Sequence, residues 1–314
     1  MIAAFDVDTG VDDSLALLYA LNKKEYFQIK GIATVTGNVD AAQVAENTLS
    51  ILDLAGADEI PVTIGAMRPL CGHWEGPVEK IHGGNGVGGA VLKKSERTCT
   101  GLGVEEHYLA LAERFARELV VIALGPLTNL ALTIKKYPQF VGMVKHVILM
   151  GGSLGYGGNV SPVAEANIAC DPEAADLVFQ SGLDVTVVGL DVTTKVRFQK
   201  AHLDWISDYC KPQCRNALAY LKEAFSWYRE GNRTQNYCMD DSPLHDPLAV
   251  MCAAVPSLIQ TKSLRARVEC GGTYCRGMIV TDRREHPFDA NYIHFAVDVD
   301  ADRAIRELMS AFWE

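Results

Sequence analysis

The sequence predicts an α/β protein with a mostly parallel, Rossmann-like sheet that is covered by helices on both faces. Short apolar segments alternate with amphipathic helical segments along most of the chain, which is typical of repeated strand–helix units. The apolar segments are continuous rather than alternating, as expected for parallel strands buried on both faces. No linker or repeat divides the chain, so residues 1–314 are expected to form one domain, with a small β-hairpin annex in the last quarter.

The expected elements follow from local sequence signals. Apolar runs predict strands at residues 2–5, 29–35, 61–65, 119–124, 144–150, 185–190 and 293–299, with further β-rich runs at 264–269 and 278–281. Helical spacing predicts helices from about residue 12, over 41–54 and 105–118, from about 126, from 172, over most of 199–230 apart from a break at Pro212, after 245–247 and from 302. Asp171 followed by Pro172 has the form of an N-cap and a first helical residue. A polar, irregular segment is expected at 231–242.

Composition and charge limit the possible partners. The net charge of −10 argues against nucleic acid and anionic membranes, because phosphate binding needs concentrated Lys and Arg. Because the first predicted strand starts at residue 2, we expect no signal peptide, and no apolar run approaches the length of about 18 residues that a membrane span requires. The nine cysteines form no CxxC pair, so free thiols and a cytoplasmic location are expected.

The first strand leads into four aspartates within eight residues, Asp6, Asp8, Asp12 and Asp13. Four carboxylates this close together cannot all stay ionised without a cation, and oxygen ligands favour calcium or magnesium over zinc. Helix N-caps would account for Asp12 or Asp13. They do not account for Asp6 and Asp8, because strand interiors disfavour aspartate. Gly10 is expected to let the chain turn between the two pairs.

Polar residues also follow several later strands. They are Asn38, the Gly125 turn, the loop that holds Asn159, Glu165 and Asn167, and the pair His245–Asp246. The carboxyl ends of parallel strands meet at one edge of the sheet, so these side chains can line one crevice. Amides and carboxylates together supply the donors and acceptors that a sugar requires. As an alternative, Asp246 is a plain N-cap followed by Pro247.

Two segments leave alternatives open. The Gly-rich run at 82–89 contains a formal GxGxxG but lacks the strand and helix that a dinucleotide site needs, so a flexible lid over the crevice is the better interpretation. His82 in this run is either an exposed loop residue or a substrate contact. Trp227 and Tyr228 have the spacing of core residues, but could stack on a planar ring if their segment closes over the crevice.

These motifs resemble a known family. Asp6-x-Asp8-x-Gly10-x-Asp12-Asp13 resembles the DxDxGxDD signature of the inosine-uridine-preferring nucleoside hydrolases. The matches continue in order with Thr36-Gly37-Asn38-Val39, Gly125-Pro126-Leu127-Thr128-Asn129, Met150-Gly151-Gly152, Gly158-Asn159-Val160, Glu165-x-Asn167, Asp171-Pro172-Glu173-Ala174 and His245-Asp246-Pro247. The resemblance covers residues 6 to about 249. It implies calcium-dependent cleavage of the N-glycosidic bond of ribonucleosides to free base and ribose, in a homodimer or homotetramer.

The resemblance also implies roles for individual residues. Asp8, Asp13 and Asp246 would bind calcium, together with the backbone carbonyl of Leu124. Asp12, Asn38 and Asn167 would hold the 2′- and 3′-hydroxyls of ribose, and Asn159 and Glu165 the 5′-hydroxyl. Asp8 would accept a proton from the attacking water, and His245 could protonate the leaving base. The role of Asp6 stays open, with support of the site as the expectation.

One position departs from the family pattern, and two other functions remain as alternatives. Residue 166 is alanine where many relatives have an aromatic side chain, which predicts a smaller wall at that point of the ribose pocket. The base pocket would come from the variable loops around 73–89 and 223–240. A haloacid-dehalogenase-like phosphatase is an alternative, because Asp6-Val7-Asp8-Thr9 also resembles its DxDxT motif, but it does not explain Asp12 and Asp13. A non-catalytic ribose- or nucleoside-binding protein is the second alternative.

Overall fold

The computed structural model describes residues 1–235 and 241–313. Its main sheet has nine strands in the order β10-β9-β11-β6-β5-β4-β1-β2-β3. These strands are β1 (Ile2–Val7), β2 (Gln28–Thr34), β3 (Val62–Ile64), β4 (Leu119–Ala123), β5 (His146–Met150), β6 (Val185–Val188), β9 (Ile259–Val268), β10 (Ile279–Asp282) and β11 (Tyr292–Val299). All neighbouring pairs from β11 to β3 are parallel, whereas β9 pairs antiparallel with both β10 and β11.

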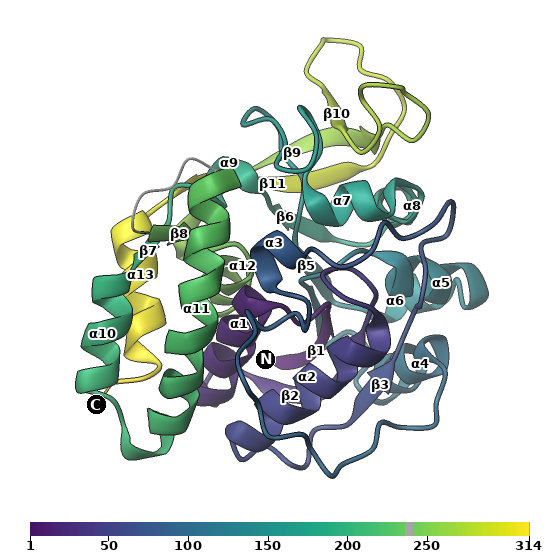
Figure 1. The fold of residues 1–314 in the computed structure, drawn as a ribbon. Helices are drawn as coiled ribbons and strands as arrows, with labels where there is room; N and C mark the ends of the chain where they lie inside the picture. Colours follow the sequence, from purple (N-terminus) through teal and green to yellow (C-terminus); the bar gives the residue numbers. More distant parts are fainter. Residues whose placement is uncertain (236–240, 314) are drawn as a thin grey trace.

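Helices cover both faces of this sheet (Figure 1). One face carries α1 (Val11–Asn22), α2 (Ala41–Leu54), α12 (Asp246–Ala254) and α13 (Ala301–Ser310), with α10 (Lys200–Asp208) and α11 (Arg215–Gln235) packed outside them. The other face carries α4 (Val104–Arg114), α5 (Thr128–Lys136), α6 (Phe140–Met143) and α8 (Pro172–Gln180). Two separate apolar cores therefore sandwich the sheet. The predicted α/β class with helices on both faces is confirmed.

Several short elements connect these layers. They are α3 (Glu79–His82), α7 (Ala166–Cys170), α9 (Leu190–Thr193), the 3₁₀ turns Pro212–Cys214 and Pro256–Leu258, and a two-stranded sheet of β7 (Arg197–Gln199) and β8 (Asp241–Pro243). The predicted hairpin in the last quarter is not a separate annex. Its strands β9 and β10 continue the main sheet through β11, which pairs in parallel with β6.

The order of the strands places a switch point beside β1. From β1 the chain builds outward through β2 and β3, and then returns to the other side of β1 with β4, β5 and β6. In such open sheets a crevice forms outside the carboxyl ends of the strands, where the order reverses. The residues that follow β1 and β4, including Asp8 and Leu124, therefore lie at the crevice.

Most predicted boundaries agree with the structure to within a few residues. Helix α2 covers the predicted 41–54, and the Asp171 carboxylate accepts the Ala174 backbone N–H at the start of α8, as an N-cap should. Asp300 likewise accepts the Arg303 N–H at the start of α13. The expected irregular segment at 231–242 is partly wrong, because α11 continues to Gln235 and β8 covers Asp241–Pro243. Residues 236–240 lie outside the described part of the chain.

Asp6 lies beneath the crevice and joins three elements. Its carboxylate accepts the Tyr108 hydroxyl from α4 at 2.7 Å and the Asn129 amide from α5 at 3.0 Å. Burial raises the pKa of Asp6 to about 7, although both hydrogen bonds act in the opposite direction. The same Asn129 side chain donates to the Thr34 carbonyl and accepts the Ala66 N–H. Asp6 therefore belongs to a buried network that fixes the ends of β1 and β2.

This network generates a stability prediction. Asn129→Ala should lower the free energy of unfolding by about 3 kcal/mol, because it leaves several buried polar groups without a partner. Lys135→Ala, at an exposed position of the same helix, is the control and should change the free energy little. Urea unfolding followed by circular dichroism measures both. A loss below about 1 kcal/mol for Asn129→Ala would show that the network is not stabilising.

Candidate active site

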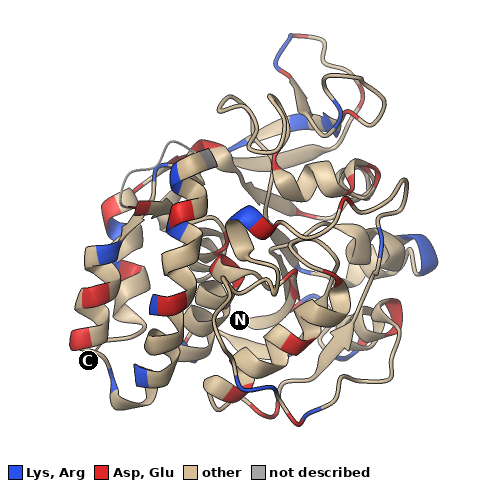
Figure 2. Ribbon diagram, in the orientation of Figure 1, with Lys and Arg blue, Asp and Glu red and all other residues tan. Residues whose placement is uncertain are grey.

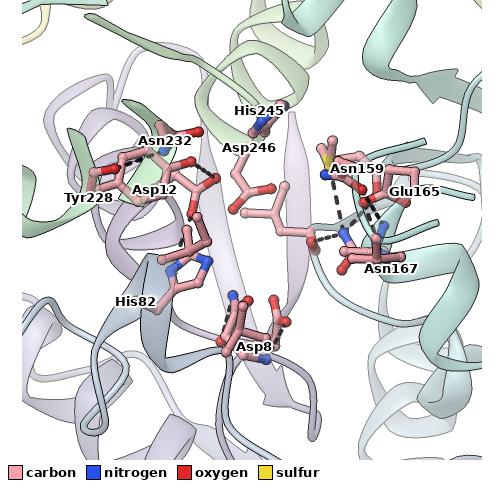
Figure 3. Close-up of a pocket in the computed structure, with 17 residues that line it drawn as sticks. Asp8, Asp12, His82, Asn159, Glu165, Asn167, Tyr228, Asn232, His245 and Asp246 are labelled. Carbon is pink, nitrogen blue, oxygen red and sulfur yellow. Dashed lines mark hydrogen bonds and ion pairs between the residues drawn. The ribbon is translucent and has the colours of Figure 1, made fainter. Parts of the chain in front are cut away.

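A cavity of about 100 Å³ opens at the carboxyl ends of β1, β4 and β5. The residues that line it come from loops and helix starts far apart in sequence. They are Asp8, Asp12, Asn38, Val78, Ile81, His82, Leu124, Met150, Asn159, Val160, Glu165, Ala166, Asn167, Tyr228, Asn232, His245 and Asp246. Figure 3 shows Asp8, Asn167 and Asp246 around one central space, with Asp12 and Tyr228 across from Asn159 and Glu165. The strand ends converge as the sequence predicts.

A group of buried carboxylates forms the acidic part of this site. One oxygen from each of Asp12, Asp13 and Asp246 lies within 4.8 Å of the others, which makes this the candidate metal cluster of the described residues. Burial raises the pKa of Asp13 to about 7 and raises that of Asp246 well above its usual range. Asp8 adjoins the cluster, and burial followed by the charge of Asp13 raises its pKa as well. A bound cation would offset the repulsion between these carboxylates and favour their ionised forms.

Helix capping explains only part of this arrangement. The N-cap of α1 is Gly10, whose N–H donates to one Asp13 oxygen at 2.8 Å. The other Asp13 oxygen and one Asp12 oxygen are buried without any hydrogen-bond partner. Asp246 is the first residue of α12, after His245 at the N-cap position, so the alternative of Asp246 as a plain N-cap is wrong. Unpartnered buried carboxylate oxygens fit a hard divalent cation.

Gly10 is required because its position has no room for a side chain, and not because the chain turns there. Its φ of −97° is open to any residue, so the expected role in bending the chain is not what the position demands. A Cβ at this position would lie 2.4 Å from His82 Nδ1 and 2.7 Å from Asn38 Nδ2. The absence of a side chain therefore lets a histidine and an amide from two other elements approach the start of α1.

The polar wall opposite the aspartates is built by α7 and the loop before it. Glu165 is the N-cap of α7: its carboxylate accepts the N–H groups of Asn167 and Ile168, and also that of Gly152. Burial raises the pKa of Glu165, against these hydrogen bonds. The Asn159 amide oxygen accepts the Ala166 N–H at 3.0 Å, so the amide nitrogen is the end that can donate to a ligand.

Asn167 and Asn38 connect this wall to the acidic cluster. Asn167 Nδ2 donates to the Leu124 carbonyl at 2.6 Å and to the Met150 carbonyl at 3.1 Å, which ties α7 to the ends of β4 and β5. The Asn38 backbone N–H donates to Asp8 Oδ2 at 2.9 Å, and its side-chain amide reaches an Asp13 oxygen at 3.4 Å. The Asn38 amide is therefore held beside the carboxylates, and the Asn167 amide beside the Leu124 carbonyl.

His82 and Tyr228 form a side wall with Asp12. The Tyr228 hydroxyl donates to Asp12 Oδ2 at 3.0 Å, and the His82 ring lies 5.5 Å from the Tyr228 ring. His82 Nδ1 accepts the Val11 N–H, so Nε2 carries the proton in the neutral imidazole. Burial lowers the pKa of His82, which favours that neutral form. The alternative of an exposed His82 is wrong.

The Gly-rich segment after His82 is packed onto the protein. Asn47 from α2 donates to the Asn85 carbonyl, and the Asn85 side chain accepts the Val87 and Gly89 N–H groups. Val87 is itself buried. Hydrogen bonds and the burial of Val87 therefore hold this segment in place, whereas the sequence predicted a flexible lid.

His245 lines the cavity at the end opposite Asp8 (Figure 3). Its Nδ1 is 2.8 Å from the Thr193 hydroxyl of α9. Burial lowers the pKa of His245 to about 4, with the nearby Asp12 acting in the opposite direction. The imidazole is therefore neutral at pH 7, so the expected proton donor to the leaving base is not in its protonated form at this pH.

One predicted substrate contact is not brought to the cavity. Trp227 is 47% exposed, and its indole N–H donates to the Glu79 carbonyl on the outer side of α11. Asn232, which the sequence did not single out, is buried and lines the cavity instead. It lies one helical turn after Tyr228 on the same face of α11, and its amide donates to the Tyr228 carbonyl. The helix predicted from the sequence ended near residue 230, so Asn232 was not recognised as lying on the same helical face as Tyr228.

No described helix combines the length and the apolar character needed to cross a membrane. Figure 2 shows the basic residues scattered over several elements, without one basic face in this view. A nucleic-acid footprint of clustered Lys and Arg is therefore not visible on this side of the molecule.

Known proteins match nearly the whole chain. The family model for "Inosine-uridine preferring nucleoside hydrolase" matches residues 3–306. Uridine nucleosidase 1 of Arabidopsis thaliana is 35% identical over 279 residues, covering 88% of this chain and 81% of that protein. The pyrimidine-specific ribonucleoside hydrolase RihA of Salmonella paratyphi C is 33% identical over 299 residues, covering 95% and 93%.

Solved structures agree with this assignment. The plant nucleoside hydrolase PpNRh1 has a TM-score of 0.92 at 32% identity, with 99% of this chain and 98% of that chain covered. A purine-preferring ribonucleoside hydrolase from Gardnerella vaginalis has a TM-score of 0.90 at 32% identity and the same coverage. The phosphatase alternative has no support among these matches. The chain belongs to the inosine-uridine preferring nucleoside hydrolase family, whose members are hydrolases that act on N-glycosyl bonds.

Proposed function

We propose that this protein is a calcium-dependent ribonucleoside hydrolase that releases a free base and ribose. The observation that carries the proposal is the meeting of a buried carboxylate cluster with amide and carboxylate side chains in one cavity. Relatives with 32–35% identity are named for uridine, for pyrimidines and for purines.

The donor set supports calcium as the metal. Asp13, Asp246, Asp8 and the Leu124 carbonyl would hold the ion, and the unpartnered oxygen of Asp12 lies close to the same point. All these donors are oxygen atoms, as calcium prefers, with no imidazole or thiolate among them. When bound, such an ion would lower the pKa of coordinated water and so ease its deprotonation by a neighbouring carboxylate.

The amides are suited to hold ribose. Asn159 and Glu165 lie together on one side of the cavity and would take the 5′-hydroxyl. Asp12 belongs to the acidic cluster, and Asn38 and Asn167 line the cavity with it. These three residues would take the 2′- and 3′-hydroxyls. Holding the sugar at both ends fixes the anomeric carbon, which lowers the barrier through orientation.

Asp8 and His245 are the proposed groups for proton transfer. The Asp8 carboxylate lines the cavity and adjoins the cluster that would hold the ion, which is where a general base for the attacking water must lie. The transition state would resemble an oxocarbenium ion, as in glycoside hydrolysis. Protonation of the leaving base by His245 would require the imidazolium form, which the charge of Asp12 favours. The ring proton would pass to the base and leave the neutral imidazole, with Thr193 setting the ring orientation.

A product assay tests the function directly. The wild-type protein should release base and ribose from inosine or uridine, and it should release no phosphate from p-nitrophenyl phosphate. Asp8→Ala should lower kcat by at least about 1,000-fold, within the range for loss of a general base. Chromatography of the bases and a reducing-sugar assay measure the products. Phosphate release without base release, or an active Asp8→Ala variant, would contradict the proposal.

Calcium binding is tested through stability. Calcium at 100 times its Kd should raise the free energy of unfolding of the wild type by about 2.7 kcal/mol. Asp13→Asn should remove most of this gain, because it replaces a carboxylate of the cluster. Asp58→Asn at an exposed loop position is the control and should keep the full gain. Equal stabilisation of all three proteins by calcium would place the ion elsewhere.

The role of His245 is tested by changing the leaving group. His245→Ala should lower kcat by about 100-fold or more on inosine, whose base needs a proton, but far less on p-nitrophenyl riboside. Thr193→Val should shift kcat in the same direction by a smaller factor, because it removes the hydrogen bond to Nδ1. Steady-state kinetics with both substrates gives the comparison. Equal losses on the two substrates would mean that His245 positions the substrate only.

A further inference from the structure

Asp191 does not line the cavity itself, but it holds the start of a loop that does. Its Oδ2 atom accepts the Leu154 N–H at 2.7 Å, and its Oδ1 atom accepts the N–H groups of Gly155 and Tyr156 at 2.8 and 3.1 Å. One carboxylate therefore binds three consecutive backbone donors. Hydrogen bonds to an ionised group are about twice as strong as those between neutral groups. The loop that these contacts anchor carries Asn159.

Helix capping does not explain these contacts. Asp191 is the second residue of α9, where an acidic side chain stabilises the N-terminus of its own helix. The N-cap of α9 is Gly189, and no side chain caps this helix. The Asp191 oxygens instead accept N–H groups that lie 35 to 37 residues earlier in the chain. The carboxylate therefore supports the loop rather than the helix that carries it.

Close packing fixes α9 against the strand end from which the loop departs. The Leu190 N–H donates to the Gly152 carbonyl at 2.9 Å, two residues after the end of β5. A Cβ on Gly189 would lie 2.6 Å from the same carbonyl oxygen, so only glycine permits this close approach. The helix and the first residues of the loop are therefore held in one arrangement, and Asp191 extends it to residues 154–156.

The later part of the loop is closed by its own backbone. The Asn159 N–H donates to the Ala164 carbonyl at 3.2 Å, and the Asn159 side-chain oxygen accepts the Ala166 N–H. The amide nitrogen of Asn159 is then the atom that can donate to a ligand. Tyr156 and Val160 are more than half exposed, at 55% and 56%. A loop with so little burial depends on its anchors for a fixed position.

Resting on the proposed function, we propose that Asp191 is a positioning residue for the 5′ end of the nucleoside. By fixing residues 154–156, it holds the Asn159 amide where the nitrogen donates to the 5′-hydroxyl. Thr193, two residues later on α9, contacts His245 instead. One short helix therefore supports the contact to the sugar and the group proposed for the leaving base through two different side chains, so the two roles can be separated by mutation.

The preference for a 5′-hydroxyl measures the role of Asp191. This preference is the kcat/KM of inosine divided by that of 5′-deoxyinosine, or the same quotient for uridine and 5′-deoxyuridine. It should be about 100-fold in the wild type, because the Asn159 amide and the buried Glu165 carboxylate lose their partner in the 5′-deoxy substrate. Asp191→Ala should lower the preference about tenfold, the order of effect of losing one hydrogen bond. The loss should fall on the parent nucleoside, with little change for the 5′-deoxy one.

Further variants test whether Asp191 acts through Asn159. Asn159→Ala should lower the preference as Asp191→Ala does, and the double variant should lower it no further, because both changes remove the same contact. Asp191→Asn keeps an oxygen for two of the three N–H groups, so its preference should lie between those of the wild type and Asp191→Ala. Thr193→Val is the matched control on the same helix and should leave the preference unchanged.

Limited proteolysis reports on the loop without any substrate. Chymotrypsin cleaves after exposed aromatic residues, and Tyr156 is such a residue within the anchored segment. Asp191→Ala should raise the rate of cleavage at Tyr156 about tenfold, because cleavage of a folded protein follows local opening. Thr193→Val should be cleaved there at the wild-type rate. Mass spectrometry of the fragments identifies the cleaved bond.

Each contrary result has its own meaning. Equal losses of kcat/KM on parent and 5′-deoxy nucleosides in Asp191→Ala, or additive losses in the double variant, would show that Asp191 does not act through Asn159. Unchanged cleavage at Tyr156 would show that Asp191 does not fix the loop. Either result overturns the proposal.

The proposed function can fail separately. A wild type that hydrolyses both members of a substrate pair equally well refutes the 5′ contact and leaves the proposed function intact. If the wild type releases base from no nucleoside, the proposed function is wrong, and the assignment of the 5′ end is wrong with it. The cleavage assay then still decides whether Asp191 holds the loop.

Discussion

Burial of several carboxylates at one point is the constraint on which the rest of the structure depends. Asp8, Asp12, Asp13 and Asp246 are all buried, and two of their oxygens lack any hydrogen-bond partner. An uncompensated buried charge is costly, so such a group persists only beside a cation or with altered protonation. The fold must therefore bring the first and the last quarter of the chain together, and the packing of α12 against α1 achieves this.

The surrounding elements act as supports for this cluster. Asn129 and Tyr108 hold Asp6 below it, while Asn167 joins α7 to the ends of β4 and β5. Asp191 accepts three backbone N–H groups, from Leu154 to Tyr156, and so anchors the loop that leads to Asn159. Each support lies on a different helix or loop, so the geometry of the cavity comes from the assembled sheet and not from any one motif.

Sequence reasoning predicted the parts of this arrangement that have a strong local signature. Continuous apolar strands, the Asp171–Pro172 helix start and the polar residues at strand ends were read correctly because each follows from propensity or from the geometry of parallel sheets. The positions of Trp227 and Asn232 were not, because the expected helix ended too early and the face that α11 turns to the cavity depends on its packing. Gly10 was linked to a turn, whereas its role comes from contacts with Asn38 and His82 that no local pattern reveals.

Glu165 carries a consequence for how this site can change. The same carboxylate starts helix α7 through two backbone N–H groups and forms part of the proposed sugar-binding wall. A mutation that adjusted the sugar contact would also loosen the first turn of α7, and with it Asn167 and the Leu124 carbonyl. A single substitution at Glu165 would therefore change the proposed sugar contact and the support of the carboxylate cluster together.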